Sequence, residues 1–237
     1  MQLLINVGGK GKRLGTLTSE LPKPMIRIYG KPVLQYLVEW AFESSFSEVI
    51  LLCGYKHELI REYFGDGTRF SLPIRYSVES TPLGSGGPIK NARHMITDTF
   101  TYISGDLICK VNFEKMYLSH ERSKPTMTVL LHESSHPNDS DILCLDEQFR
   151  VNRFIGKNEI HGSDCGNLTN AGLCILETKV LDYMQEDVFT FETYLYPRLI
   201  SMSEHIHGYV SDEVIFDMGT PERLEAAEKI LITTNGH

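Results

Sequence analysis

Apolar runs alternate with helically spaced segments through the first half of the chain. Residues 3–7 (LLINV), 48–53 (EVILLC), 73–79 (PIRYSVE) and 99–106 (TFTYISGD) are short runs with strand character. Helical spacing occupies the stretches between them, at residues 32–46, 57–64 and 84–96, the last opening after a glycine loop. This alternation predicts βαβ units, which implies a mostly parallel sheet with right-handed crossovers.

The second half of the chain has a different pattern. Four β-type runs follow one another with few helices between them, at residues 126–133, 141–147, 149–155 and 167–177. A helix at 190–202, strands at 205–210 and 213–218 and a final helix at 221–232 complete the pattern. We predict one α/β domain, Rossmann-like, with a mixed and mostly parallel sheet flanked by helices and a more antiparallel half. The domain is expected to have two halves, residues 1–110 for the nucleotide and residues 111–237 for the sugar phosphate. Ligands are expected outside the carboxyl ends of the strands.

Composition narrows the class of protein. The chain has 237 residues, of which 41% are hydrophobic and 23% charged, and it contains no apolar stretch long enough to cross a membrane. Because the N-terminus enters a strand directly, without the features of a secretory signal, we expect a cytoplasmic protein. A net charge of −8 argues against nucleic acid and membrane partners. The five cysteines have no CxxC spacing and are expected to be reduced core thiols, without zinc or disulfides.

Positive charge is concentrated near the N-terminus. Between Lys10 and Lys31 there are six lysines and arginines but a single acid, and they begin within the string GGKGKR at residues 8–13. A glycine turn after a strand lets backbone N–H groups approach phosphate oxygens, and adjacent cations neutralise the phosphate charge. The string matches neither the dinucleotide-binding glycine pattern nor the P-loop pattern. We therefore predict an anion site of another kind.

Longer strings carry a specific resemblance. GGKGKRL, LTSELPKPM and GKPVL, followed in order by ESTPLGSGGPIKNA, SGDL, NAGLCILE and FDMGTPERLEAAE, resemble the sugar-nucleotide pyrophosphorylases over nearly the whole chain. The chain departs from the usual pattern at Lys12, where Thr is usual, and at Gly15-Thr16, where the family often has a Pro before Leu-Thr. The resemblance implies a glycosyltransferase-A-like nucleotidyltransferase fold. It also implies an enzyme that joins a nucleoside triphosphate to a sugar 1-phosphate and releases pyrophosphate. The segment HPNDSD at 136–141 is similar to a branch that transfers GMP to D-glycero-D-manno-heptose 1-phosphate.

This reaction needs positioning and charge neutralisation, since the attacking phosphate oxygen is already anionic near neutral pH. The resemblance implies that backbone donors of Gly8, Gly9 and Gly11 wrap the triphosphate. Arg13 would brace the β and γ oxygens, and Lys23, fixed between two prolines, would lie against the α-phosphate or the sugar phosphate. Asp106 and Asp217 each end a predicted strand, and the resemblance assigns one Mg²⁺ to this pair.

The resemblance also indicates which residues bind the nucleobase and which bind the sugar. Glu79, Gly84 and Ser85 belong to the part that reads the base, and a carboxylate at Glu79 is compatible with the N–H donors of guanine. The sugar phosphate is assigned to Lys157, and the sugar to Asn170, Gly172 and Glu192. Lys157 is followed by Asn158 where relatives have proline. Glu192 is equally interpretable as an ordinary acid in the first turn of a helix.

Several alternatives stay open at this stage. The most direct reading is a guanylyltransferase for a heptose or mannose 1-phosphate, serving surface glycans such as capsule or lipopolysaccharide. A cytidylyltransferase or uridylyltransferase for another phosphorylated metabolite fits the same phosphate residues. A regulatory subunit that binds nucleotide sugars without making them is a different class, although the chain retains the residues assigned to catalysis. A homodimer is compatible with the sequence, which does not specify the oligomeric state.

Overall fold

The structure is a computed structural model, and it describes residues 1–9, 11, 21–134, 140–157, 159, 165–213, 215–218, 220, 222–225 and 227. Arg13, which was predicted to brace the triphosphate, lies outside the described residues. So does most of the predicted final helix, of which residues 222–225 and 227 are described and helical.

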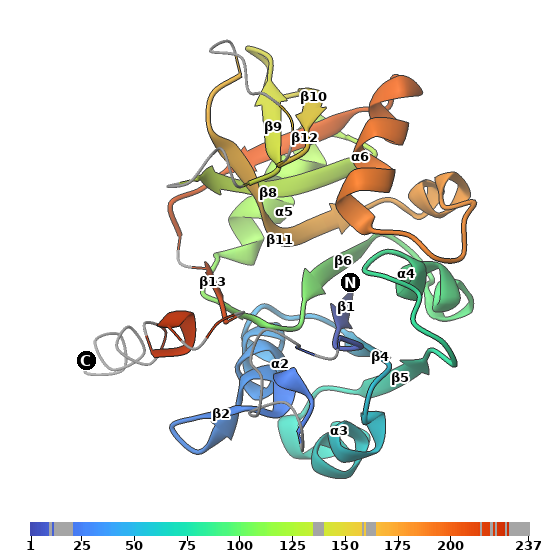
Figure 1. Ribbon diagram of the computed structural model, residues 1–237, viewed down its shortest axis with the longest axis vertical. Coiled ribbons are helices and arrows are strands. Elements are labelled where there is room, and N and C mark those ends of the chain that lie inside the picture. Colours follow the sequence, from blue (N-terminus) through green and yellow to red (C-terminus); the bar gives the residue numbers. More distant parts are fainter. Residues whose placement is uncertain are drawn as a thin grey trace. The chain divides into compact units, whose positions relative to one another are not determined.

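The chain forms two compact units (Figure 1). The first unit is made of described residues within Met1–Pro82, Ile103–Val111 and Glu213–His237, and the second of those within Leu83–Tyr102 and Asn112–Asp212. The strand at residues 100–104 contributes to both. The predicted division into halves at residue 110 stays a prediction.

The sheet of the first unit has the order β6-β1-β4-β5, in which β4 pairs in parallel with both β1 and β5. Its central strands are short apolar runs in which Leu3, Leu4 and Ile5 of β1 and Ile50, Leu51 and Leu52 of β4 are fully buried, as expected for parallel strands covered on both faces. Figure 1 shows the helices of this unit beside the sheet. The elements are β1 (Gln2–Asn6), the 3₁₀ helix η2 (Lys23–Met25), β2 (Arg27–Ile28), β3 (Lys31–Pro32), α2 (Val33–Glu43), β4 (Glu48–Cys53), α3 (His57–Phe64), the 3₁₀ helix η3 (Thr68–Phe70), β5 (Ile74–Val78), β7 (Leu107–Cys109) and β13 (Ile215–Asp217).

The second unit is largely antiparallel. Strand β11 pairs antiparallel with both β8 and β9, and β10 pairs antiparallel with β9, while β12 adds to β8 in parallel. The elements are α4 (Gly87–Asn91), the 3₁₀ helix η4 (Arg93–Met95), β6 (Phe100–Ser104), α5 (Phe113–Ser123), β8 (Met127–Glu133), β9 (Ile142–Leu145), β10 (Val151–Ile155), β11 (Leu168–Leu176), the 3₁₀ helix η6 (Thr178–Tyr183), α6 (Phe191–Ser201) and β12 (Ile206–Val210). The fold class predicted from the alternation of elements is therefore confirmed: a mixed α/β fold with a parallel sheet and a more antiparallel part.

Two local expectations differ from the structure. The helix expected to open after the glycine loop in residues 84–96 is present but short: it is α4, followed by one turn of 3₁₀ helix, because the glycines at its start do not favour helix and pack against another segment. The prediction of reduced thiols fails for Cys144 and Cys165, which form a disulfide with a Cα–Cα distance of 5.0 Å. Cys53, Cys109 and Cys174 are free and buried, as predicted.

Candidate active site

The predicted phosphate loop follows β1 in the first unit. The Gly8 N–H donates to the Asn6 side-chain oxygen at 3.4 Å, and Gly11 has a φ of +61°, a conformation that glycine adopts without strain. Within the part of the chain that the structure describes, no atom beyond its chain neighbours lies within 4 Å of where a Cβ on Gly9 would be, and Gly9 is exposed. The loop therefore presents backbone at the carboxyl end of β1, where a phosphate could approach it.

Glu79, the predicted base-reading carboxylate, lies against this loop. A Cβ on Gly8 would be 3.2 Å from Glu79 Oε1, and a Cβ on Gly54 would overlap the same oxygen. The Glu79 N–H donates to the Cys53 carbonyl at 2.9 Å, so the residue continues directly from the pairing of β4 with β5. Two glycines from separate strand ends thus make room for one carboxylate beside the phosphate loop.

Lys23 is held by the prolines on either side of it. Pro22 has φ −66° and ψ 146°, and Pro24 takes the first turn of η2, in which the Met25 N–H donates to the Pro22 carbonyl at 2.8 Å. The Lys23 side chain is only 12% exposed. The predicted restriction of the backbone at Lys23 is therefore present, and it directs the ammonium group inward.

Asp106 and Asp217 are brought together by pairing of the segments that carry them. Strand β13 pairs antiparallel with β7, so that Asp217 is opposite Leu107, and the Met218 N–H donates to the Asp106 carbonyl at 3.0 Å. The Gly105 N–H donates to the Asn6 carbonyl at 2.9 Å, which places Asp106 at the same strand end as the phosphate loop. Two carboxylates separated by 111 positions (217 − 106) are thus neighbours in space.

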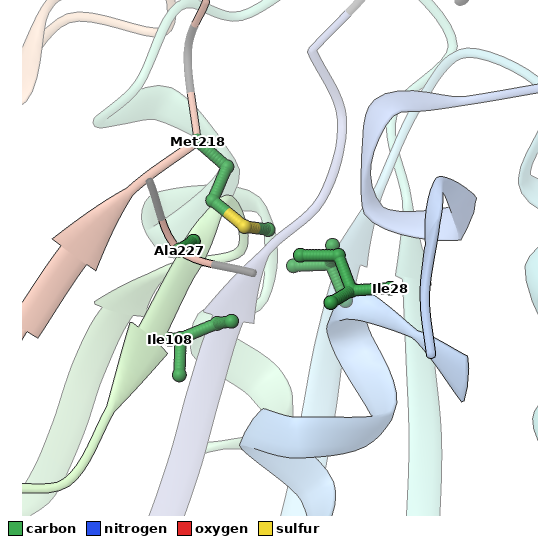
Figure 2. Close-up of a cluster of buried hydrophobic side chains, with 5 residues drawn as sticks. Ile28, Ile108, Met218 and Ala227 are labelled. Carbon is green, nitrogen blue, oxygen red and sulfur yellow. The ribbon is translucent and has the colours of Figure 1, made fainter. Parts of the chain in front are cut away.

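A buried apolar cluster joins the segments that carry these charged groups (Figure 2). Met218 follows Asp217 directly and is 1% exposed, and Ile108, two residues after Asp106, is 2% exposed. Ile28, from the segment that follows Lys23, packs in the same cluster and is fully buried. The remaining members are Val33 and Ala227. The cluster therefore anchors all three segments that supply the charged groups.

The charged groups form a compact ionic arrangement. The Lys23 ammonium pairs with Asp106 Oδ2 and lies 3.9 Å from Asp217 Oδ1. Arg223 donates to the other oxygen of Asp217. Asp217 Oδ1 is buried and has no hydrogen-bond partner among the described residues. Since an unsatisfied buried carboxylate oxygen is costly, this oxygen is suited to a cation.

These residues fit the magnesium predicted from the resemblance. Carboxylate oxygens are the ligands that Mg²⁺ prefers, and it is usually bound by one or two carboxylates together with waters and substrate phosphates. No group of three or more His, Cys, Asp or Glu side chains is arranged to hold a metal among the described residues. Asp106 and Asp217 would hold the ion as a pair, with the other ligands supplied by substrate and water.

In the second unit, the loop of Gly84 and Ser85 packs on the segment that leads into α6. The Gly86 N–H donates to the Phe189 carbonyl at 3.0 Å, and the Phe189 N–H donates to the Leu83 carbonyl at 3.1 Å. A Cβ on Gly84, whose φ is +81°, would overlap the Phe189 carbonyl oxygen. The glycines that the sequence suggested for base recognition therefore also permit this close packing.

Glu192 lies in the first turn of α6 and is near Ser85. Ser85 Oγ is 3.4 Å from Glu192 Oε2, and burial raises the pKa of the Glu192 carboxyl, with the Asp141 carboxylate adding to the rise. The sequence assigned Ser85 to the nucleotide and Glu192 to the sugar, and the structure brings the two together.

Asn170 and Gly172 form an irregularity in β11. The pairing of β11 with β8 shifts between Asn170 and Cys174, and Gly172 has a φ of +83°. The Gly172 N–H donates to the Asn170 side-chain oxygen at 2.9 Å. A bulge of this kind turns side chains out of the regular alternation, which is typical of residues that meet a ligand.

Lys157 is exposed, and its backbone is held by Asp141. The Lys157 N–H donates to Asp141 Oδ1 at 2.9 Å, after the end of β10. Asp141 thus contacts the Lys157 turn and also influences Glu192. His136 and Asp139, from the HPNDSD string, lie outside the described residues.

Sequence reasoning missed three residues of the first unit that support the site: Asn6, Gly54 and Arg223. Arg223 lies near the start of a helical segment, where the helix dipole does not favour a base, and its carboxylate partner could not be read from the sequence. Gly54 follows a buried strand, as Gly8 does, but its closeness to Glu79 depends on the pairing of β4 with β5.

Comparisons with known proteins show the family of the chain. Residues 3–233 match the model of the family described as nucleotidyl transferase. The D-glycero-alpha-D-manno-heptose 1-phosphate guanylyltransferase of Aneurinibacillus thermoaerophilus is 33% identical over 233 residues, which are 98% of each chain. An enzyme of the same name from Campylobacter jejuni is 29% identical over 94% of this chain and 96% of its own. The crystal structure of HddC from Yersinia pseudotuberculosis has a TM-score of 0.82 at 27% identity, covering 97% of this chain and 99% of that one. HddC has also been solved in complex with GMP-PN.

Proposed function

The chain belongs to the nucleotidyl transferase family, and on that premise we propose that it transfers GMP from GTP to a heptose or mannose 1-phosphate, releasing pyrophosphate. The observation that carries the proposal is the convergence of Lys23, Asp106 and Asp217 beside the glycine turn of the first unit. Polyphosphate chemistry needs cations and metal-binding carboxylates together, and three distant segments supply them there.

The proposed chemistry is an in-line displacement at the α-phosphorus of the nucleotide. The phosphate oxygen of the sugar 1-phosphate attacks, and pyrophosphate leaves. No general base is needed, because a phosphate monoester is largely dianionic near pH 7. Gly8, Gly9 and Gly11 would bind the triphosphate through backbone N–H groups, and Arg13 would neutralise the leaving pyrophosphate. Lys23 would neutralise charge on the reacting phosphates.

Mg²⁺, held by Asp106 and Asp217, would supply positive charge at the phosphate oxygens as the displacement proceeds. The Lys23 ammonium already lies between these carboxylates, so a positive charge at this point is compatible with the surrounding groups. Arg223 would keep Asp217 oriented through its second oxygen.

Residues of the second unit would bind the sugar phosphate. Lys157 would pair with the phosphate, while Glu192 and the bulge at Asn170 and Gly172 would meet sugar hydroxyls. The two guanylyltransferases above act on D-glycero-alpha-D-manno-heptose 1-phosphate by name, and their full-length coverage supports a heptose as the acceptor. The HddC complex with GMP-PN supports a guanine nucleotide. Glu79 beside the phosphate loop would accept the guanine N–H donors.

The test measures pyrophosphate release from GTP with D-glycero-D-manno-heptose 1-phosphate or mannose 1-phosphate, with and without Mg²⁺. We expect Asp106→Asn, Asp217→Asn and Lys23→Ala each to lower kcat by about 100-fold or more, since each removes a group that stabilises transition-state charge. Asp182→Asn and Lys115→Ala, at exposed positions of the second unit, are the matched controls and should keep full activity.

A second readout does not depend on turnover. Mg²⁺ with a non-hydrolysable GTP analogue should raise the Tm of the wild type and of Asp182→Asn, and should raise it much less in Asp106→Asn and Asp217→Asn. Full pyrophosphate release by a well-folded Asp106→Asn variant would refute the catalytic assignment.

Two other functions are separated by the same assay. Strong turnover with CTP or UTP and none with GTP would replace the guanylyltransferase by a cytidylyltransferase or uridylyltransferase. Binding of a nucleotide sugar without pyrophosphate release from any of the four triphosphates would indicate a regulatory subunit.

No helix in the described part of the chain is long and apolar enough to cross a membrane. We propose that the enzyme acts in the cytoplasm, where triphosphates are made.

A further inference from the structure

Ser85 is attached to the start of α6 by its hydroxyl group. The Phe191 N–H donates to Ser85 Oγ at 2.8 Å, and Ser85 Oγ donates to Glu192 Oε2 at 3.4 Å. The hydroxyl thus accepts from one residue of the helix and donates to the next. Both contacts lie within the second unit and span more than 100 positions of sequence.

The first of these bonds completes the helix end. The first N–H groups of a helix have no partner within it, and a side-chain oxygen at the preceding residue usually accepts one of them. Thr190 occupies that position in α6 but makes no side-chain bond to the helix. Ser85 supplies the acceptor from a distant loop, so the orientation of the first turn of α6 depends on it.

The loop that carries Ser85 is itself firmly held. Its neighbours Gly84 and Gly86 pack so closely on Phe189 that a Cβ on either would overlap that residue. The Tyr102 hydroxyl donates to the Ser85 carbonyl at 3.0 Å, and the Tyr102 ring stacks on Phe191 with centroids 4.9 Å apart. Ser85 is therefore a fixed point against which Glu192 can be oriented.

The other groups that face Glu192 do not provide this support. Asp141 carries a like charge, and burial beside Cys174 of β11 and Tyr196 of α6 disfavours the ionised carboxylate. The Tyr196 hydroxyl is directed to Cys174 Sγ, at 3.8 Å. Of the side chains that these contacts involve, Ser85 is the one that donates a hydrogen bond to Glu192.

We propose that Ser85 is a positioning residue for the sugar, which holds the Glu192 carboxylate ionised and oriented to accept hydrogen bonds from the hydroxyls of the sugar 1-phosphate. The proposal rests on the proposed function, in which Glu192 meets the sugar. It changes the role expected for Ser85 from the sequence, which was nucleotide binding.

The test separates the two substrates. Ser85→Ala should raise the KM for the sugar 1-phosphate about fivefold to tenfold, the size expected for loss of one hydrogen bond to a charged group, and leave the KM for GTP within about twofold. Ser85→Thr, which keeps the hydroxyl, should restore the sugar KM to near its wild-type value. In a Glu192→Gln background, Ser85→Ala should have less than about a twofold further effect.

Acidity separates loss of the donor from loss of helix packing, because exposure of Glu192 on loosening of α6 would lower its pKa, whereas loss of the Ser85 hydrogen bond would raise it. Without the Ser85 donor the pKa of Glu192 should rise further, so the acid limb of kcat/KM for the sugar should move to higher pH. ¹³C NMR titration of labelled glutamate carboxyls, with the Glu192 signal identified by its loss in Glu192→Gln, measures the same change without catalysis. If Ser85→Ala does not fold, Ser85→Cys, a weaker donor, replaces it in both measurements.

The outcomes distinguish this proposal from the proposed function. An unchanged Glu192 pKa and unchanged sugar KM in Ser85→Ala, with weakened sugar binding in Glu192→Gln, would overturn the positioning role alone. A raised KM for GTP with an unchanged sugar KM would also overturn it, in favour of nucleotide binding. If Glu192→Gln leaves the sugar KM unchanged, the assigned sugar site fails, while the NMR titration still decides whether Ser85 supports Glu192.

Discussion

At the scale of single residues, the important polar side chains are each held by a partner from a distant part of the chain. Lys23 meets Asp106, and Ser85 meets Glu192. The residue types could be recognised from the sequence, because prolines flank Lys23 and strands lead into Asp106. The partners of these residues could not be recognised from the sequence, since a contact between residues 80 or more positions apart depends on how whole elements pack.

Glu204 is a further example, outside the proposed site. Its carboxylate accepts hydrogen bonds from Thr126 and Tyr183 and pairs with Lys179 at 2.8 Å. These donors, with Lys179 first, lower the pKa of Glu204 to about 2. An unfolded glutamate has a pKa of about 4.3, so the unfolded chain binds more protons between these values. The stabilisation from Glu204 is therefore complete at neutral pH and is lost as pH falls from about 4.3 to 2.

We predict that Glu204→Gln lowers the free energy of unfolding at pH 7 by about 1–3 kcal/mol, because the charged acceptor is lost. The difference from wild type should shrink as pH falls below about 4.3. Urea unfolding at a series of pH values measures both effects, with Glu147→Gln, an exposed glutamate of the same unit, as control. A difference that stays constant down to pH 2 would contradict this account.

At the scale of elements, hydrophobic periodicity gave the right type for the segments to which it was applied, whereas the helix α5 and the short strands β2, β3 and β7 were not predicted. The strand EVILLC and the helix HELIREYF appear with the bounds that their patterns predict. Each segment has enough apolar residues at strand or helix spacing to mark where it begins and ends. The glycine-rich segment at 84–96 was the exception. Glycine carries no side-chain signal, and its role there is to allow close packing, which only the tertiary structure determines.

Two glycines between α3 and β5 test whether the role of a glycine depends on its tertiary contacts. Gly67 has a φ of +88°, and a Cβ there would overlap the Leu72 carbonyl oxygen, whereas Gly65, with φ +57°, faces open space. Gly65→Ala should cost about 1–3 kcal/mol of stability, since only backbone strain opposes it. Gly67→Ala adds a steric overlap and should cost clearly more. Thermal unfolding of the two variants compares them, and equal losses would show that backbone strain alone sets the cost.

At the scale of the whole molecule, two compact units have different strand arrangements, and each holds part of the proposed machinery. The change in the sequence from alternating strands and helices to consecutive strands predicted the more antiparallel part. The resemblance paired Asp217 with Asp106, but the strand pairing that joins them, β13 with β7, came from the structure. The sequence also failed to predict the pairing of Cys144 with Cys165, because the two lie 21 positions apart without a spacing that indicates a partner.

The disulfide gives a prediction for the intact chain. Protein purified without reductant and then denatured should titrate three thiols, from Cys53, Cys109 and Cys174, and five after reduction. Cys144→Ser should titrate four without reductant, because Cys165 is released. Reduction should lower the free energy of unfolding by about 2–4 kcal/mol, since the bond closes a loop across residues 144–165. Five thiols in the unreduced wild type would exclude the bond.

The sequence by itself determined most of the elements, the kind of chemistry and the family, because periodicity, prolines, glycine turns and strand-end carboxylates are local properties of the chain. Tertiary structure alone decided which carboxylates share Lys23, which glycines make room for Glu79 and which hydroxyl orients Glu192. Those contacts depend on strand pairing and side-chain packing between segments far apart in sequence, and no local pattern encodes them.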